Sequence, residues 1–474
     1  MILATRRPLL AAAAALVLAA PLAAQSPQAR PSMEETQRII DSLANDAVNE
    51  GRFSSVSVGV VRGRDTVLLA AYGLADREGQ LPAGPDVAYR LASITKQFTA
   101  ALVLQLADEG RLSLGDSVGK WLPQVPPAWR GVTVAQLLNH TSGIPSYTAL
   151  GPAWMQRWGE DMEPDTIIAL TFGKPMDFEP GAKFRYDNTG YVILGRIVEL
   201  AMGKSYEEAV QERLAGPLGL EGLSYCPSRP TAATDARPYE RAPGGLFMPA
   251  PYLSMTQPYA AGALCATAHD LVRWNAALHG GRVVSDSLYW RMVTPEGAAR
   301  ASRYAFGLSR DTVAGHEAIT HNGGINGGST EGWYFPDDST SIVALANTGN
   351  GGALAKLVRQ MARAVYGVPL VQPPTTIPLT ATERAMYVGR YELSMGERKL
   401  PLEVRESGEG LTAQPAGQPA YPIIQVAPRT FVLADDDAIR LVFTTEGGRA
   451  TQVVLEQGGA RIVGPRVESA GTPR

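Results

Sequence analysis

The chain has 474 residues, of which 45% are hydrophobic and 19% are charged, and its formal net charge at pH 7 is −3. This composition is typical of an ordinary globular protein, and the length suffices for one large and one small domain. No cluster of lysine and arginine stands out, so binding to nucleic acid or to an anionic membrane surface is disfavoured.

The first 24 residues have the pattern of a secretory signal peptide, which predicts an exported protein, periplasmic or extracellular. Arg6 and Arg7 precede an apolar run over residues 9–20, and Leu22-Ala23-Ala24 is typical of a cleavage site. The apolar run is short for a membrane span, and no later segment is long enough for one. We therefore expect no stable membrane anchor after cleavage.

From residue 33 the pattern predicts a helix, two strands and a long region of short helices, before strands and a final helix return. Periodic apolar positions bounded by Gly or Pro carry each assignment. The predicted helices are 33–50, 133–139, 164–171, 190–202, 206–214, 269–278 and 352–366, and the predicted strands are 57–61, 66–72, 328–335 and 340–347. This order predicts an α/β (α+β) domain whose sheet takes its edges from both ends, with helices inserted between them.

Ser93 lies three residues before Lys96 at the start of a further predicted helix that Gly110 closes. Residues three apart share a helix face, so the lysine amine can lie against the serine hydroxyl and activate it as a base. Burial would lower the pKa of the lysine into a useful range. Alone, the spacing fits a helix-capping serine beside a surface lysine at least as well. Ser117 and Lys120 repeat the spacing in a loop without a helical apolar face, and we interpret that copy as solvated.

Tyr186 and Asn188 lie in a loop that follows a Pro-Gly turn and precedes a strongly predicted helix. The phenol could relay a proton near the serine, and the amide could hydrogen-bond a substrate carbonyl. The alternative is a core tyrosine followed by a capping asparagine. His140, in the segment His-Thr-Ser-Gly after a predicted helix, we interpret as structural.

Cys226 and Cys265 are the two cysteines of the chain. In an oxidising compartment two cysteines favour one disulfide, and the alternative is two separately buried thiols.

The segment His321-Asn322-Gly323-Gly324 is predicted to lie at a strand end. A side-chain donor followed by glycines would let a substrate backbone approach the strand and would offer N–H groups to an oxyanion. Alone, the pattern is that of an ordinary glycine-rich strand end.

Residues 368–379 are rich in proline and poor in charge, which predicts a semi-rigid linker. Residues 387–467 then contain about eight short strand patterns broken by Gly, Pro or Asp, which predicts a small antiparallel β-barrel. The predicted division is a signal peptide at 1–24, a main domain at 25–367, the linker at 368–379 and a barrel domain at 380–474.

Taken together, these motifs resemble those of the serine β-lactamase and penicillin-binding-protein family: Ser-x-x-Lys at a helix start, Tyr-x-Asn in a later loop, and His-x-Gly before the final strands. The surroundings of Ser93, the segment 137–143 and the segment 188–191 match too. The resemblance covers residues 33–368 and is to the branch with class C β-lactamases, D,D-carboxypeptidases, D-aminopeptidases and β-lactamase-like esterases. The segment from residue 387 is similar to the lipocalin-like barrels often appended to such hydrolases.

The resemblance implies a β-lactamase/transpeptidase-like antiparallel sheet flanked by helices, with an inserted helical subdomain, and a serine hydrolase that works through an acyl-enzyme. In this scheme Ser93 is the nucleophile, Lys96 is its base partner and Tyr186 relays the proton to the leaving group. No glutamate is placed to act as a separate deacylating base.

The resemblance also implies the substrate contacts. Asn188, His321 and Gly323 would bind the substrate, and the backbone N–H groups of Ser93 and Gly324 would form the oxyanion hole. β-Lactamases and cell-wall carboxypeptidases usually have Lys-Thr-Gly where this chain has His321, Asn322 and Gly323. Histidine is mostly neutral at pH 7, so the difference favours esterase or D-aminopeptidase activity over penicillin hydrolysis.

Other classes have less support. A catalytically inactive recognition module for penicillin or cell wall is the main alternative, but the complete set of serine, lysine, tyrosine and asparagine argues against it. The five histidines show neither HExxH nor HxHxD spacing, and no Gly-x-Ser-x-Gly elbow exists. We therefore expect neither metal nor cofactor, and a small molecule or peptide as the substrate. The choice among peptide, ester and β-lactam stays open, as does the oligomeric state.

Overall fold

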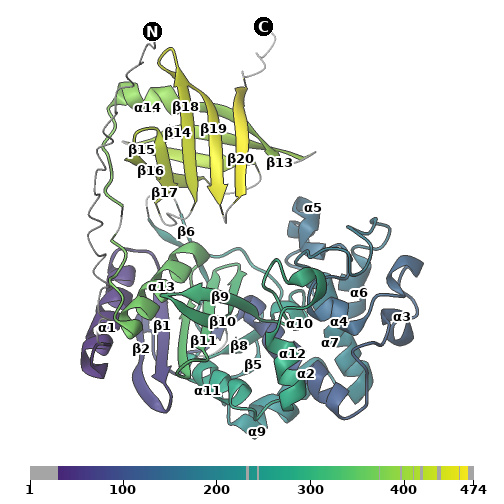
Figure 1. The fold of residues 1–474 in the computed structure, drawn as a ribbon. Helices are drawn as coiled ribbons and strands as arrows, with labels where there is room; N and C mark the ends of the chain where they lie inside the picture. Colours follow the sequence, from purple (N-terminus) through teal and green to yellow (C-terminus); the bar gives the residue numbers. More distant parts are fainter. Residues whose placement is uncertain are drawn as a thin grey trace, which may run out of the picture.

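The computed structural model describes residues 30–467, except for 231–233, 243–244, 373, 396–397, 409, 417–419, 435–438 and 458–459. The predicted signal peptide lies outside the described residues. The chain forms a body of helices around an antiparallel sheet and a separate closed barrel, joined by an extended segment (Figure 1). In the part of the chain that is described, no helix combines the length and apolar character needed to cross a membrane.

The body is built on a seven-stranded antiparallel sheet with the order β3-β2-β1-β12-β11-β10-β9. Its strands are β1 Ser55–Arg62, β2 Asp65–Asp76, β3 Leu81–Pro82, β9 Ser309–Val313, β10 His316–Ile325, β11 Gly328–Phe335 and β12 Thr340–Ala346. β1 pairs with β12 from Val56 opposite Ala346 to Arg62 opposite Thr340. The N-terminal hairpin is thus joined to the C-terminal strands, which confirms that both ends of the domain build the sheet.

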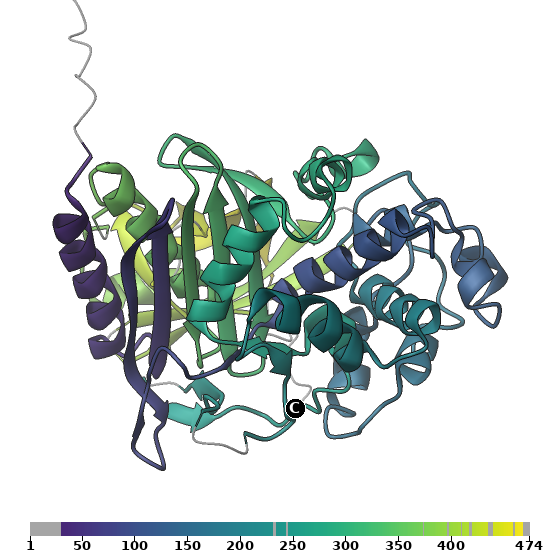
Figure 2. The ribbon, with the colours of Figure 1, turned by 90° about the horizontal axis from the view of Figure 1, so that it is seen from below.

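Two layers of helix cover the sheet (Figure 2). α1 (Met33–Asn49) and α13 (Gly351–Tyr366) pack on one face, and α2 (Thr95–Asp108) and α11 (Ala268–His279) pack on the other. The sequence of α13 explains why this segment forms a helix. Its buried apolar side chains recur every three to four residues, Asn350 caps its N-terminus and Gly367 ends it at a φ of 68°. A Cβ at Gly59 of β1 would lie 2.8 Å from Val272, so this glycine lets α11 approach.

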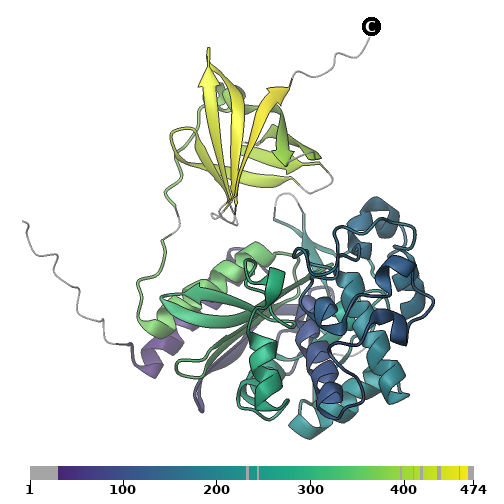
Figure 3. The ribbon, with the colours of Figure 1, turned by 45° about the vertical axis from the view of Figure 1, so that its right-hand side comes forward.

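The inserted helical part lies beside the sheet (Figure 3). Its helices are α3 Val118–Trp121, α4 Val134–Leu138, α5 Pro152–Met155, α6 Pro164–Ala169, α7 Asn188–Met202, α8 Tyr206–Val210, α9 Gly216–Leu218, α10 Tyr259–Gly262 and α12 Asp286–Val293. The helices predicted at 133–139, 164–171 and 190–202 are confirmed. The helix predicted at 206–214 is α8 continued by a π-helix over Gln211–Ala215.

A three-stranded sheet of very short strands, with the order β4-β8-β5, was not predicted. Its members are β4 Tyr89–Arg90, β8 Leu264–Ala266 and β5 Ser224–Tyr225. Strands of two or three residues have no room for an alternating pattern, so the sequence carries little signal for them. This sheet matters because β4 leads directly to Ser93. A further hairpin, β6 (Tyr239–Arg241) with β7 (Phe247–Pro249), also escaped prediction.

The C-terminal strands close into the predicted eight-stranded barrel. They are β13 Gly389–Met395, β14 Arg398–Ser407, β15 Gly410–Pro415, β16 Tyr421–Ala427, β17 Thr430–Leu433, β18 Arg440–Glu446, β19 Arg449–Gln457 and β20 Ala460–Val467, preceded by α14 Ala381–Tyr387. Tyr387, Tyr391, Phe431 and Phe443 pack together inside the barrel. Arg466 donates to the carbonyl of Ala450 (3.0 Å) and to that of Val388, the residue that follows the C-terminus of α14.

The linker between body and barrel is tethered at both ends. At its start the N–H of Val371 donates to Gln360 of α13 (2.9 Å), and Arg363 donates to the carbonyl of Pro369 (2.6 Å). At its end the N–H of Ile377 donates to the carbonyl of Gln425 in β16 (2.7 Å). These contacts leave at most residues 372–376 between the tethers, within the predicted linker at 368–379.

Candidate active site

Ser93 lies in a single 3-10 turn, η1 (Ala92–Ile94), between β4 and α2. The N–H of Leu91 donates to the carbonyl of Leu264 in β8 (2.8 Å), which ties the start of the turn to the small sheet. Ala92 is buried and has a φ of 48°, a conformation that costs a non-glycine residue about 1–3 kcal/mol. The surrounding strands therefore hold a strained turn that directs the partly exposed Ser93 out of the core.

Lys96, in the first turn of α2, is fully buried, and its Nζ makes three hydrogen bonds. The acceptors are Ala261 O (2.7 Å), Asn188 Oδ1 (2.8 Å) and Ser93 Oγ (3.1 Å). The two carbonyl-type oxygens can only accept, so they occupy two N–H groups of Lys96 in either protonation state. In the neutral amine the lone pair then faces Ser93 and can take up the hydroxyl proton.

The pKa of Lys96 is lowered, which suits an amine that takes up the proton of Ser93. Burial lowers the pKa to about 7, and the nearby Asp187 carboxyl opposes part of the fall. Asp187 is itself buried, which raises its pKa to about 7. It caps the N-terminus of α7 by accepting from the N–H of Gly190 (3.1 Å) and also accepts from the hydroxyl of Ser142 (3.2 Å).

Tyr186 interacts with Ser93, and this interaction opposes part of the rise that burial causes in the pKa of the phenol. The Tyr186 ring lies 4.8 Å from Lys96 Nζ, a cation–π geometry. Although 36% of Tyr186 is exposed, the protein around the phenol raises its pKa by desolvation. Tyr186 is therefore protonated at neutral pH and can donate a proton.

Asn188 begins α7, and both the oxygen and the nitrogen of its side-chain amide form hydrogen bonds. Its Oδ1 accepts from Lys96, and its Nδ2 donates to Thr148 Oγ1 (3.1 Å). Its backbone N–H donates to Ser146 Oγ (3.1 Å). The second Nδ2 hydrogen is the one left for a substrate carbonyl, so substrate binding by Asn188 stays a prediction.

Gly323 and Gly324 of β10 differ in their surroundings. A Cβ at Gly323 would lie 2.2 Å from Thr330 Oγ1 and 2.3 Å from the carbonyl of Leu91, so the missing side chain lets β10 lie against the Ser93 turn. Gly324 is exposed, and a Cβ there would meet no atom within 4 Å. The part played by its N–H in an oxyanion hole stays a prediction.

His321 is buried, and both ring nitrogens have partners inside the protein. Nδ1 lies 2.6 Å from the carbonyl of Asn322, which can only accept, so Nδ1 carries the proton. Nε2 then accepts from the hydroxyl of Tyr304 (3.0 Å). Burial, helped by the charge of Lys96, lowers the pKa of His321 to about 3. Neither nitrogen is free for a substrate here, so direct substrate binding by His321 stays a prediction that needs one of these bonds to break.

The site also uses groups that the sequence motifs did not indicate. The carbonyl of Ala261, the hydroxyl of Thr148 and the phenol of Tyr304 each bond a motif residue. Ala261 acts through its backbone, which no side-chain pattern can report. Thr148 and Tyr304 lie outside the three motifs.

Cys226 and Cys265 are joined in a disulfide. Cys265 lies in β8, a few residues after Ala261 in the chain, and pairs with Arg90 of β4, the strand that leads to the Ser93 turn. The bridge packs with Met255 and Ala263. The disulfide therefore braces the segment whose carbonyl bonds Lys96.

The second Ser-x-x-Lys copy is unlike the first. Ser117 precedes the short helix α3, and Lys120 is exposed and pairs with Asp116 (2.8 Å). Among the described residues no group of three or more His, Cys, Asp or Glu side chains is arranged to hold a metal ion.

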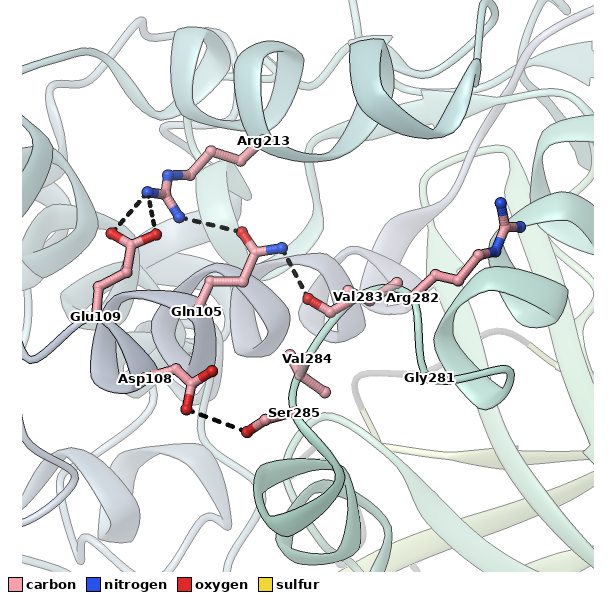
Figure 4. A pocket seen from close by; sticks show the side chains of 9 residues that line it. All are labelled: Gln105, Asp108, Glu109, Arg213, Gly281, Arg282, Val283, Val284 and Ser285. Atoms are coloured by element: carbon pink, nitrogen blue, oxygen red, sulfur yellow. Dashed lines mark hydrogen bonds and ion pairs between the residues drawn. The ribbon is translucent and has the colours of Figure 1, made fainter.

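A surface recess of about 500 Å³ lies at the far end of α2 (Figure 4). At 1.5 Å per residue the helix separates this recess from Ser93 by about 20 Å. Arg213 there pairs with Glu109 (2.6 Å), and Asp108 accepts from Ser285 (3.1 Å). The recess is separate from the motif residues.

Comparison with known proteins matches residues 40–366 to the family described as Beta-lactamase. A D-aminopeptidase of Gluconobacter oxydans is 27% identical over 369 residues, which cover 75% of this chain and 69% of that protein. A D-stereospecific amidohydrolase from Streptomyces sp. has 30% identity and a TM-score of 0.60, over 70% of this chain and 98% of that one. An octameric penicillin-binding protein homologue from Pyrococcus abyssi, at 24% identity and a TM-score of 0.63, is similar in fold over 90% of this chain and 99% of its own.

Proposed function

Because this chain belongs to the β-lactamase family, we propose that it is a serine hydrolase that cleaves amide or ester bonds through an acyl-enzyme at Ser93. The observation that carries the proposal is the arrangement around Lys96 Nζ. Two acceptors hold two of its N–H groups, and the third position faces the Ser93 hydroxyl.

In the proposed acylation, neutral Lys96 takes the proton of Ser93 while Oγ attacks the substrate carbonyl carbon. The N–H groups of Ser93 and Gly324 stabilise the oxyanion. When the tetrahedral intermediate collapses, the carbon–nitrogen bond breaks and Tyr186 donates its proton to the leaving amine. The resulting phenolate lies beside the Lys96 ammonium, which balances its charge.

In the proposed deacylation, the Tyr186 phenolate takes a proton from water, and the hydroxide so formed attacks the acyl carbon. The Ser93 oxygen leaves and recovers its proton from the Lys96 ammonium. Both groups return to their starting protonation states, and no further base is needed. This agrees with the absence of a separately placed glutamate in the sequence motifs.

We propose amides and short peptides of D-amino acids as the substrate class. The D-aminopeptidase and the D-stereospecific amidohydrolase to which the chain is similar support this choice. The depressed pKa of His321 supports it too, because a neutral ring offers no fixed cation to the carboxylate of a penicillin or of a terminal D-alanine.

Labelling at Ser93 tests the proposal. The protein is exposed to a fluorophosphonate, and its intact mass is measured beside the variants Ser93→Ala and Ser117→Ala. We expect one adduct on the wild type and on Ser117→Ala, and none on Ser93→Ala. Turnover of D-alaninamide should depend on Ser93 in the same way. An unlabelled wild type would contradict the proposal and favour a recognition module without catalysis.

Export stays a proposal that rests on the pattern of residues 1–24. The disulfide between Cys226 and Cys265 supports it, because such bonds persist in oxidising compartments. The division of the mature chain into a hydrolase domain at 25–367 and a lipocalin-like domain at 380–474 is likewise proposed.

A further inference from the structure

His140 packs against Tyr186 and has almost no exposed surface. The centroids of the two rings are 4.3 Å apart, and the imidazole also contacts the rings of Tyr191 and Tyr304. The backbone of His140 has a φ of 59°, in the left-handed region. The buried imidazole of His140 thus packs against the Tyr186 ring.

The same residue holds the backbone on both sides of Tyr186. The N–H of Arg185 donates to the carbonyl of His140 (3.0 Å), and the N–H of Asp187 donates to His140 Nδ1 (3.1 Å). Tyr186 is the residue between these two bonds. His140 therefore holds Tyr186 through two hydrogen bonds with the flanking backbone and one tilted ring–ring contact.

The hydrogen bonds also fix the chemical state of His140. Nδ1 accepts from a backbone N–H, so it carries no proton, and the neutral ring has its proton on Nε2. Burial, with the charges of Lys96 and His321, keeps the pKa of His140 well below its usual value. Protonation of Nδ1, which would break the contact with Asp187, is thus opposed.

Nε2 is buried without a hydrogen-bond partner among the described residues. An unpaired buried N–H costs about 1–3 kcal/mol, which an apolar side chain of similar size would avoid. The imidazole is thus a poor choice for stability alone. What it supplies, and an apolar ring would not, is the Nδ1 acceptor for Asp187.

From these contacts, and resting on the proposed function, we propose that His140 is a positioning residue for Tyr186. It holds the phenol where the proton of Tyr186 can reach the leaving group of the substrate. In this scheme His140 acts through Tyr186 and takes no part in bond making or proton transfer itself.

Two amide variants separate this role from packing. His140→Asn places an oxygen at the δ position, where it can still accept from the Asp187 N–H, and asparagine tolerates a positive φ. His140→Gln places its amide one atom further out and loses the δ acceptor. Thermal unfolding of both variants shows that each is folded before rates are compared.

Two substrates of D-alanine separate the proton donor from the rest of the machinery. The p-nitroanilide needs a proton on its leaving nitrogen, whereas p-nitrophenolate leaves from the ester without one. We expect His140→Gln to lower kcat/KM for the anilide, which reports the steps up to acylation, by about 10²-fold, the cost of misplacing a catalytic group by about 1 Å. The kcat/KM for the ester, whose p-nitrophenolate leaves before deacylation, should change little. His140→Asn should recover most of the anilide rate.

Tyr186→Phe should show the same selective loss of kcat/KM on the anilide. The double variant His140→Gln/Tyr186→Phe should be no slower than Tyr186→Phe alone, because the two residues act as one unit. Equal losses on ester and anilide in His140→Gln, additive losses in the double variant, or no recovery in His140→Asn would overturn the positioning role. If His140→Gln does not fold, a selective anilide loss in His140→Asn would overturn it as well.

The controls keep the two proposals apart. Failure of the wild type to be labelled by a fluorophosphonate at Ser93 would overturn the proposed function itself. A wild type that is labelled and cleaves the ester but not the anilide would overturn only the role of His140, because Tyr186 would then protonate no amine at this site.

Discussion

The side chain of Lys96 has no exposed surface, and burial of an ammonium group is unfavourable because the charge loses its water. Asp187 is buried too, and the pKa values of both groups move to about 7. The two groups interact, so the titration near neutral pH belongs to the pair. The fold thus keeps a substantial fraction of Lys96 as the neutral amine at the pH where the enzyme would work.

The first prediction concerns the pH dependence of acylation. Deprotonation of Lys96 creates the base, so the rate of fluorophosphonate labelling should rise as the pH increases through about 7 and then level off. Lys96→Arg stays charged and should lower the rate at neutral pH by about 10²–10⁴-fold and remove the rise. The measurement is the labelling rate by intact mass between about pH 5 and 9.

Lys120→Arg, in the solvated copy of the motif, is the matched control and should behave as the wild type. A wild-type labelling rate that does not change with pH would argue against Lys96 as the base. At the residue scale the sequence motifs indicated Ser93, Lys96, Tyr186 and Asn188, and the structure brings these side chains together around Lys96 Nζ. They could not locate Ala261, because it contributes only a carbonyl.

At the scale of elements, β10 and the Ser93 turn determine the shape of the site. Thr330 of β11 donates to the carbonyl of Leu91 (2.8 Å), the atom that Gly323 also approaches. The sequence predicted that residues 321–324 lie at a strand end, and they form the last part of β10, which ends at Ile325.

The second prediction compares the two glycines of β10. Gly323→Ala forces a Cβ against Thr330 and Leu91 and should destabilise the protein by about 1–3 kcal/mol, the usual cost of overpacking. It should also slow labelling of Ser93, because β10 must move away from the turn. Thermal unfolding and fluorophosphonate labelling measure the two effects.

Gly324→Ala is the control on the same strand, since its Cβ meets no atom and its N–H is kept. It should lose much less stability and labelling than Gly323→Ala. Equal losses in the two variants would mean that the close approach of Gly323 to the turn is unimportant for the site.

At the scale of the whole molecule, the body and the barrel were predictable from pattern, while the contacts of the segment that joins them were not. Eight short strands with regular breaks predicted the barrel, and proline content predicted the linker. The tethers at Val371 and Ile377 depend on partners 11 and 48 residues away, Gln360 and Gln425, which local patterns do not report. Long-range contacts of this kind are decided by tertiary packing.

The residues proposed for catalysis all belong to the body, between residues 93 and 324. The barrel lies close to β6 (Figure 1), and the pKa of Tyr421 is raised by burial and, to a smaller extent, by the charge of Glu240. Glu240 also accepts from the N–H of Gly327 (2.8 Å), in the turn that joins β10 to β11. Glu240 thus connects Tyr421 of the barrel with the turn that joins β10 to β11.

The third prediction is that the barrel is not needed for the chemical step. A protease site inserted after Pro374 cuts between the two tethers and leaves every described residue of the body in place. Cleavage should leave the rate of fluorophosphonate labelling unchanged, because Lys96 and the turn of Ser93 are held by α2, β8 and β10. The uncut protein with the same insertion is the control. If cleavage slows labelling, Glu240→Gln should slow it in the uncut protein too, and the barrel would then support the turn at Gly327 through β6.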